Sequence, residues 1–514
     1  MLLVYAIVAV LCFSQPIAYA YGYLGDTPYQ NQTFVSTPLQ IQRDLGANVT
    51  IDQLIWPTID LSTAYFVRDY SSIRLHGIRN LLHMGYKRLV IDIYWYKSDW
   101  QLCPFPLDSV PDNYTCSANA TLSNFMFAVN DYLLSTDLSY APMQTDLVFI
   151  VLNLHQIDNT TADAYLANII TQSISVPRLY TPVNMTADQY GPNASFFAND
   201  SQPYFPIKKL QSAFLWPQWL YLIQNEARLL VGLGTQPSNQ TSYRFTSSDN
   251  NIIFSSQHTI LSNPQACPQN TSWAFVSDAN QTPFDYSSAL KVTQCGYSPI
   301  FSHHNYSTSE SIKSDVDSGH LADNILSSIW SWDVNEPNTA KLNKCAAMML
   351  SNGRWRASDC TNEYRVACRL QDDPDVWLIT QETYNYDHSI TACPPDYTFD
   401  VPRIPRQNTL LKRLLDQQTD IQQDRIWINL NLAGSREPCW VIGRYGSCWW
   451  TDNDKDAFSG LIRTSIVSGV IILIVVIIFM WVKCARLWRN RNSKTRKAAI
   501  KAMLAKRDYV TIPA

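Results

Sequence analysis

Three polar residues, Asp92, Asn153 and His155, lie where they could take part in acid–base chemistry. They fall near the ends of two predicted strands, the runs RLVIDIYW at residues 88–95 and DLVFIVLNLH at residues 146–155. Enzymes built on parallel strands place catalytic side chains at such strand ends. The structural alternative is that Asp92 is a buried, hydrogen-bonded carboxylate and His155 a polar strand-end residue. Asp92 and His155 are therefore candidate catalytic residues, and no cofactor is expected.

The segments that would position these residues alternate between helix and strand. Residues 71–84 carry apolar side chains at helical spacing, and Gly85 ends that helix before the strand at residues 88–95. The near-continuous apolar run at residues 146–155 is typical of a strand that is covered on both faces. This repetition predicts an α/β, barrel-like domain over residues 21–255.

The charge of the chain is divided between two regions. Only 16% of the 514 residues are charged, against about 25% in an average soluble domain. Residues 464–482 contain no charge and are long enough to cross a bilayer as one helix, and ten basic residues and one acid follow in residues 483–514. The positive-inside tendency places this basic tail in the cytoplasm. We expect lipid headgroups, and not nucleic acid, to be its partner.

The amino terminus predicts secretion. Residues 1–20 contain an apolar run that ends in Ala18-Tyr19-Ala20, a signal-peptidase pattern. Together with the expected span at residues 464–482, this signal predicts a single-pass type I membrane protein of the secretory pathway or cell surface. Twelve acceptor sites for N-glycosylation lie on the lumenal side: Asn31, Asn48, Asn113, Asn119, Asn159, Asn184, Asn193, Asn199, Asn239, Asn270, Asn280 and Asn305.

An even number of cysteines supports this compartment. The ectodomain contains Cys103, Cys116, Cys267, Cys295, Cys345, Cys360, Cys368, Cys393, Cys439 and Cys448, enough for five disulfides. Cys103 and Cys116 are close enough to staple the excursion at residues 100–122. Cys439 and Cys448 predict a hairpin closed by a disulfide.

Residues 265–372 resemble the C-terminal half of a C-type lectin-like domain. The resemblance rests on WSWDVNEPN at residues 330–338, on GRW at 353–355 and on YRVACR at 364–369. It implies that Cys345 pairs with Cys360 and Cys295 with Cys368, which leaves Cys267 and Cys393 for each other. Residues 373–450 resemble a second, partial module of the same kind.

The lectin-like loop could hold Ca²⁺ through Glu336 and Asn338. Sugar-binding members of the family add further oxygen ligands, because Ca²⁺ takes six to eight of them. Here Arg356 and Ala357 follow Trp355, so half of the ligand set is missing. No metal is therefore assigned, and the alternative is a loop kept for its turn geometry.

Taken together, these motifs resemble the fungal maintenance of telomere capping protein 6 family. The segments IDLSTAYFVRDY, YKRLVIDIYW, IWSWDVNEPN and ACPPDYTFDVPR carry the resemblance, which extends from about residue 59 to residue 450. It implies a type I membrane glycoprotein with a role connected with telomere capping. We expect a non-catalytic ectodomain that binds a protein or glycan ligand.

The competing interpretation is a lumenal phosphodiesterase or glycosidase on the α/β domain. That domain invites comparison with the phosphatidylinositol phospholipase C type of barrel, in which two histidines, an acid and an arginine act at strand ends. His76 and Arg79 fall in a predicted helix instead, and no second acid or histidine occurs at a recognisable spacing. Asp92 and His155 within hydrogen-bond reach in an open pocket would favour the enzyme, whereas buried or distant side chains would argue against it.

Overall fold

A computed structural model of the chain describes residues 32–97, 99–156, 166–190, 216–234, 245–255, 259–261, 267, 272–279, 282–303, 318–339, 343–418, 420, 422–434, 439–444, 446–450, 472–482 and 494–507. It forms two compact units, residues 1–431 and residues 432–514. Each unit is described by itself.

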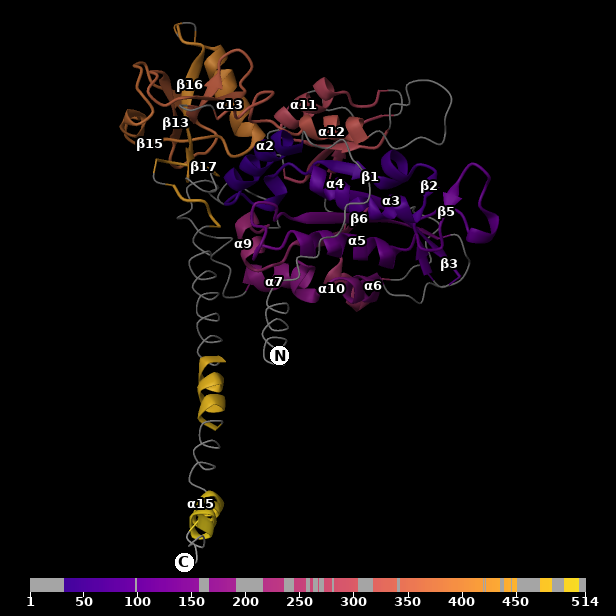
Figure 1. Ribbon diagram of the computed structural model, residues 1–514. Coiled ribbons are helices and arrows are strands. Elements are labelled where there is room, and N and C mark those ends of the chain that lie inside the picture. Colours follow the sequence, from indigo (N-terminus) through magenta and orange to yellow (C-terminus); the bar gives the residue numbers. More distant parts are fainter. Residues whose placement is uncertain are drawn as a thin grey trace, which may run out of the picture. The chain divides into compact units, whose positions relative to one another are not determined.

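A parallel sheet forms the core of the first unit (Figure 1). Its strands follow the order β7-β6-β3-β1-β10-β9-β8, every neighbouring pair in this order is parallel, and β4 pairs with β3 in the antiparallel sense. The strands are β1 (Thr58–Asp60), β3 (Arg88–Tyr96), β4 (Asp99–Gln101), β6 (Val148–Gln156), β7 (Leu229–Leu233), β8 (Thr259–Leu261), β9 (Ala274–Ser277) and β10 (Ser298–Phe301). The prediction of a barrel-like α/β domain with parallel strands is confirmed.

Helices cover the outer face of this sheet. Leu89, Ile91 and Ile93 of β3 pack in one apolar cluster with residues of α4 and α5. Because side chains alternate along a strand, the other residues of β3 face the interior of the barrel. The helices of this part are α2 (Gln32–Leu45), α3 (Ser72–His76), α4 (Ile78–Met84), α5 (Leu122–Ser135), α6 (Leu166–Ser173), α7 (Pro182–Tyr190), α9 (Trp219–Gln224), α10 (Ser247–Ile252), α11 (Tyr286–Gln294) and α12 (Ser318–Leu326). Two short strands, β2 (Asp69–Tyr70) and β5 (Thr115–Cys116), pair with each other in a small separate sheet.

The barrel sheet continues past residue 255, where the sequence predicted its end. Strands β9 and β10 belong to this sheet and precede the lectin-like motifs in the chain. Each has only four residues, so its apolar run is too short to stand out from the sequence.

A second, mostly antiparallel sheet follows in the same unit. Its order is β12-β11-β16-β13-β14, with β15 paired to β13. The bounds are β11 (Asn343–Met349), β12 (Trp355–Asp359), β13 (Arg365–Leu370), β14 (Trp377–Ile379), β15 (Tyr397–Phe399) and β16 (Arg425–Ala433), with the helix α13 (Pro405–Asp416). Strand β16 lies between β11 and β13, so the boundary expected at residue 372 falls within one sheet.

Three of the five expected disulfide pairs are present and two are corrected. Cys103–Cys116, Cys345–Cys360 and Cys439–Cys448 pair as predicted. The pairs expected between Cys295 and Cys368 and between Cys267 and Cys393 were wrong, because Cys267 bonds to Cys295 and Cys368 bonds to Cys393. The helix α11, which Cys295 follows directly as its C-cap, packs beside β10 of the barrel. Each corrected disulfide therefore joins residues close in the chain.

The second unit contains the strand β17 (Cys439–Val441), a helical stretch at residues 472–482 and the helix α15 (Lys494–Arg507). None of the helices in the described part of the chain combines the length and the apolar character needed to cross a membrane. The expected signal at residues 1–20 and the first part of the expected span, residues 464–471, lie outside the described residues.

Four of the twelve predicted glycosylation sites lie in described segments. Asn113, Asn119 and Asn184 are exposed, whereas Asn48 is half-buried. The other eight lie outside the described residues: Asn31, Asn159, Asn193, Asn199, Asn239, Asn270, Asn280 and Asn305.

Candidate acid–base site at the strand ends

The register of the parallel sheet brings the predicted site residues onto one edge. Asp92 of β3 is opposite Asn153 of β6, and Tyr94 is opposite His155. Leu152 and Leu154 pack in the outer apolar cluster, so Asn153 and His155 face the barrel interior. The inner faces of β3 and β6 therefore carry a joint polar cluster, which extends from the middle of β3 towards the carboxyl end of β6.

Asp92 is the centre of this cluster. Asn153 Nδ2 donates a hydrogen bond of 2.9 Å to Asp92 Oδ1, and His155 Nε2 lies 3.3 Å from the same oxygen. The His155 contact is at the outer limit for a hydrogen bond, and Nε2 has no partner of regular geometry in the described chain. The His155 ring stacks on Tyr94 with 4.8 Å between the ring centroids. The Asp92 and His155 side chains are 21% and 34% exposed, so the pair is open to a ligand in part.

Gly234 leaves the space that Asn153 needs. A Cβ atom at position 234 would lie 1.9 Å from Asn153 Oδ1, which is far inside van der Waals contact. Any larger residue there would displace the amide that donates to Asp92.

A second carboxylate lies on the neighbouring strand. Asp60 ends β1, which pairs with β3, and its Oδ1 accepts hydrogen bonds from the backbone N–H groups of Ser62 and Thr63 at 3.1 and 3.2 Å. Those residues begin a π-helical turn, Leu61–Phe66, and such turns are frequent at functional sites. The side chain of Ser62 also accepts the backbone N–H of Asp92 at 3.0 Å. Asp60 and Asp92 are thus joined through one turn.

The two carboxylates have opposite pKa shifts. Burial and the nearby charge of Asp92 raise the pKa of Asp60 to about 6, in spite of its two backbone hydrogen bonds. Burial alone would also raise the pKa of Asp92, but His155, Asn153 and Ser62 outweigh it and hold that pKa below its ordinary value. Two neighbouring carboxyl groups whose pKa values are shifted in opposite directions suit the separate roles of acid and base.

Sequence reasoning missed a second histidine–carboxylate pair on the same edge. His303 Nδ1 lies 3.0 Å from Asp278 Oδ1, which also accepts the backbone N–H of Ser302 at 2.9 Å. Asp278 follows β9 and His303 follows β10, the strand beside β1. Asp60 therefore lies between two histidine–carboxylate pairs in strand order. The signal was a polar residue directly after each of two short apolar runs, AFVS and PIFS.

The remaining sequence candidates lie elsewhere. His76 and Arg79 are on α3 and α4, as expected, and Arg79 forms an ion pair of 2.8 Å with Asp131. They take no part in the strand-end cluster.

The lectin-like loop uses its candidate ligands for its own backbone. Glu336 Oε2 accepts the N–H groups of Asn338 at 2.6 Å and of Ala357 at 3.1 Å. Arg356 forms an ion pair of 2.6 Å with Asp333 where further acidic ligands would be needed. Among the described residues, no group of three or more histidine, cysteine or acidic side chains is placed to hold a metal.

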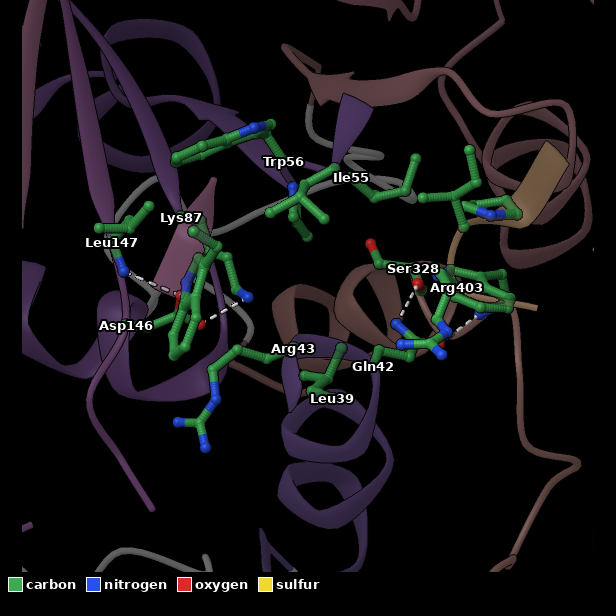
Figure 2. A pocket seen from close by; sticks show the side chains of 16 residues that line it. Leu39, Gln42, Arg43, Ile55, Trp56, Lys87, Asp146, Leu147, Ser328 and Arg403 are labelled. Atoms are coloured by element: carbon green, nitrogen blue, oxygen red, sulfur yellow. Dashed lines mark hydrogen bonds and ion pairs between the residues drawn. The ribbon is translucent and has the colours of Figure 1, made fainter. Parts of the chain in front are cut away.

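A small cavity lies at the opposite, amino-terminal edge of the barrel strands (Figure 2). Its volume is about 40 Å³, enough for a few water molecules. Lys87 forms an ion pair of 2.5 Å with Asp146 on one side, and Gln42 donates to the carbonyl of Ser328 at 3.3 Å on the other. Because its polar groups bond to each other, we interpret this cavity as a packing junction.

The parallel sheet, its covering helices and the polar strand ends define a partial α/β barrel with an acid–base cluster at its carboxyl edge. A family profile described as the MTC6 partial TIM-barrel domain matches residues 31–321, more than half of the chain. The chain belongs to the maintenance of telomere capping protein 6 family.

Curated relatives with that name match nearly the whole chain. The protein of Candida albicans (strain WO-1) is 24% identical over 95% of both chains. The protein of Komagataella phaffii (strain GS115) is 26% identical over 79% of this chain and 82% of its own. The family resemblance stated from the sequence is confirmed.

Two solved structures are similar to part of the chain, with low TM-scores. A calcium-dependent phosphoinositol-specific phospholipase C from a Pseudomonas species covers 56% of this chain and 91% of its own, with 11% identity and a TM-score of 0.29. A phosphatidylinositol-specific phospholipase C from Staphylococcus aureus covers 57% of this chain and 98% of its own, with 8% identity and a TM-score of 0.28.

Proposed function

We propose that the barrel carries a hydrolytic acid–base site whose substrate is a phosphodiester. The observation that carries the proposal is the position of Asp92 Oδ1, 2.9 Å from Asn153 Nδ2 and 3.3 Å from His155 Nε2, beside a second carboxylate with a raised pKa. This differs from the sequence-based expectation of a non-catalytic ectodomain. The short distance between Asp92 and His155 and their partial exposure support the enzyme interpretation, which required the two side chains to lie within hydrogen-bond reach in an open pocket.

The residues can be assigned roles by their surroundings. The carboxylate of Asp92 favours a proton on Nε2 of His155, which leaves Nδ1 to accept a proton from an attacking water. Asp60, with its pKa near 6, retains enough of its proton in mildly acidic conditions to protonate the leaving oxygen. The bond from phosphorus to the leaving oxygen then breaks as the bond to the water oxygen forms.

The choice of substrate rests on the two imidazoles. His155 and His303 lie on one strand edge, each beside a carboxylate, and an imidazole can act as a base when neutral and pair with a phosphate when protonated. A second candidate substrate is a glycoside. It is favoured by the opposite pKa shifts of Asp60 and Asp92, because glycosidases use one protonated and one ionised carboxyl group.

The sequence supports a proposal for the membrane topology and compartment of this site. We propose a type I membrane glycoprotein whose barrel lies on the lumenal or extracellular side, anchored by residues 464–482, with the lectin-like region as a binding module for a protein or glycan. The relatives' name refers to telomere capping. A lumenal barrel has no direct access to chromosome ends.

The test is hydrolysis by the full-length protein in detergent. We expect slow turnover of bis(p-nitrophenyl) phosphate and its loss in Asp92→Asn, with none on p-nitrophenyl glycosides. Asp131→Asn is the matched control, because Asp131 is 59% exposed and pairs with Arg79 on the outer helices. Turnover of glycosides alone would favour the second candidate. No turnover of either substrate by a folded protein would return the ectodomain to the class of binding modules.

A further inference from the structure

Arg88 is a buried cation in the interior of the barrel. It begins β3, opposite Thr58 of β1 and Phe149 of β6, and only 1% of its surface is exposed. Its guanidinium lies 4.1 Å from the ring centroid of Phe275 and 5.5 Å from that of Phe149. These contacts support the charge on its flat faces but satisfy none of its N–H groups.

Two of the guanidinium nitrogens, Nε and Nη1, have no hydrogen-bond partner in the described chain. Arg228, another buried arginine of the barrel, has a hydrogen-bond acceptor for each of its guanidinium nitrogens. Its Nε donates to Asp146 O at 3.1 Å, its Nη1 to Leu133 O at 2.8 Å and its Nη2 to Thr136 Oγ1 at 2.7 Å. A buried charge without partners is costly, so Arg88 requires an acceptor that the described chain does not supply.

Aromatic rings pack together at the amino-terminal edge of the barrel, beside the Phe149 ring that contacts Arg88. Trp56 precedes β1 and Trp273 precedes β9, and their ring centroids are 5.7 Å apart. Phe149 contacts both rings, at 6.1 and 5.5 Å. These rings, the aromatic floor, offer no acceptor to the guanidinium, which leaves the side of the strand ends for an approaching ligand.

The nearest acidic group on that side is already engaged. Asp60 lies on the neighbouring strand β1, two residues after Thr58, which is opposite Arg88. Its Oδ1 accepts hydrogen bonds from the backbone N–H groups of Ser62 and Thr63. Burial lowers the pKa of Arg88 to about 9, against the opposing charge of Asp60, so the guanidinium stays protonated at neutral pH. The positive charge of Arg88 thus lies on the amino-terminal side of the strand-end cluster, and its Nε and Nη1 have no hydrogen-bond acceptor in the described chain.

We propose that Arg88 binds an oxyanion of the phosphate class, between the aromatic floor and the strand-end cluster. The inference rests on the proposed function and deepens it, since it makes the ligand one that enters the barrel with its anionic group first. The oxyanion accepts hydrogen bonds from Nε and Nη1 and neutralises the guanidinium. Arg88 is then a ligand-binding residue, separate from the acid and base at the strand ends.

The experiment measures thermal unfolding of the full-length protein in detergent at pH 7. Inorganic phosphate is compared with sodium chloride at equal ionic strength. We expect phosphate at tenfold excess over its Kd to raise the Tm by about 3 °C, and chloride to leave it unchanged. Arg88→Met should abolish the phosphate effect. Arg356→Met, which removes an exposed cation, should keep it.

Two further variants make every outcome informative. If Arg88→Met does not fold, Arg88→Lys keeps the charge but loses the planar set of donors, and its phosphate effect should fall at least tenfold in apparent affinity. Asp92→Asn should lose turnover but keep the phosphate effect, so that failure of the catalytic proposal is distinguishable from failure of this one. Equal effects of phosphate and chloride on the wild-type protein, or a phosphate effect that survives in Arg88→Met, would overturn the assignment.

Discussion

His155 Nε2 lies 3.3 Å from Asp92 Oδ1, on two neighbouring parallel strands whose register places these residues two positions apart. Asn153 fixes the same carboxylate oxygen from the other side at 2.9 Å. The contact joins a partly exposed imidazole to a carboxylate whose pKa is held low, which is the relationship expected of a base and its orienting acid. The predictions below test this relationship and the fold around it.

Replacing His155 by alanine should remove the general base. We expect turnover of the phosphodiester probe to fall by about 10²- to 10⁴-fold, with a loss of stability near 1 kcal/mol from the stack on Tyr94. Steady-state kinetics and urea unfolding measure the two effects. His76→Ala is the control, because His76 is an exposed residue of α3 outside the cluster. Equal losses in both variants would show that His155 has no special role.

Asp60 should make the protein less stable as the pH rises. Its folded pKa is raised from 3.8 to about 6, so the folded state holds the proton more tightly and loses stability as the pH rises between these values. Asp60→Asn should therefore be more stable than the wild type at pH 7, by at most about 3 kcal/mol, and equally stable below pH 4. Urea unfolding across pH 3.5–7.5 provides the measurement.

Asp92 should behave in the opposite way. Its folded pKa is lowered, so its contribution to stability is present above the unfolded pKa and is lost as the pH falls through the folded one. Asp92→Asn should be less stable than the wild type at pH 7, and the difference should shrink in acid. The same direction of change in Asp60→Asn and Asp92→Asn would show that the two carboxyl groups do not differ as the structure indicates.

Gly234→Ala should disturb the site by displacing the side chain of Asn153. The added Cβ would lie 1.9 Å from Asn153 Oδ1, so the amide must move away from Asp92. We expect a loss of about 1–3 kcal/mol in stability and a fall in turnover. Gly443→Ala in the second unit is the control. It has φ +77° but no atom within 4 Å of the added Cβ, so it should cost about 1 kcal/mol and leave turnover unchanged.

The disulfide pairing can be checked by peptide mapping without reduction. We expect linked peptides for Cys267–Cys295 and Cys368–Cys393. Under denaturing conditions without reduction, Cys393→Ser should leave the Cys368 thiol open to alkylation while Cys267 stays protected by its bond to Cys295. The lost disulfide should cost about 3 kcal/mol in stability because the closed loop is of moderate length. Alkylation of Cys267 in that variant, with Cys368 protected, would support the lectin-type pairing instead.

Local patterns were enough to predict the elements around the site. The strands β3 and β6 are nine residues long in the structure. Asn153 and His155 lie in the carboxyl-terminal half of β6, as the sequence indicated, whereas Asp92 lies at the middle of β3 and not near its end. Strands β9 and β10 have only four residues each, so Asp278 and His303 were not connected with the site. A short strand receives its stability from its neighbours in the sheet and leaves little pattern in its own residues.

The amino-acid sequence by itself determined the family, the alternation of helices and parallel strands, and the candidate pair Asp92 and His155. These depend on residue types and on periods of two and 3.6 residues, which operate over short stretches of chain. Only the tertiary structure decided that Cys368 bonds to Cys393, that His303 pairs with Asp278 at the end of the same sheet and that Arg88 has no acceptor for two of its nitrogens. Those relationships depend on strand order and register, which bring together residues far apart in the chain, and on what burial leaves without a partner.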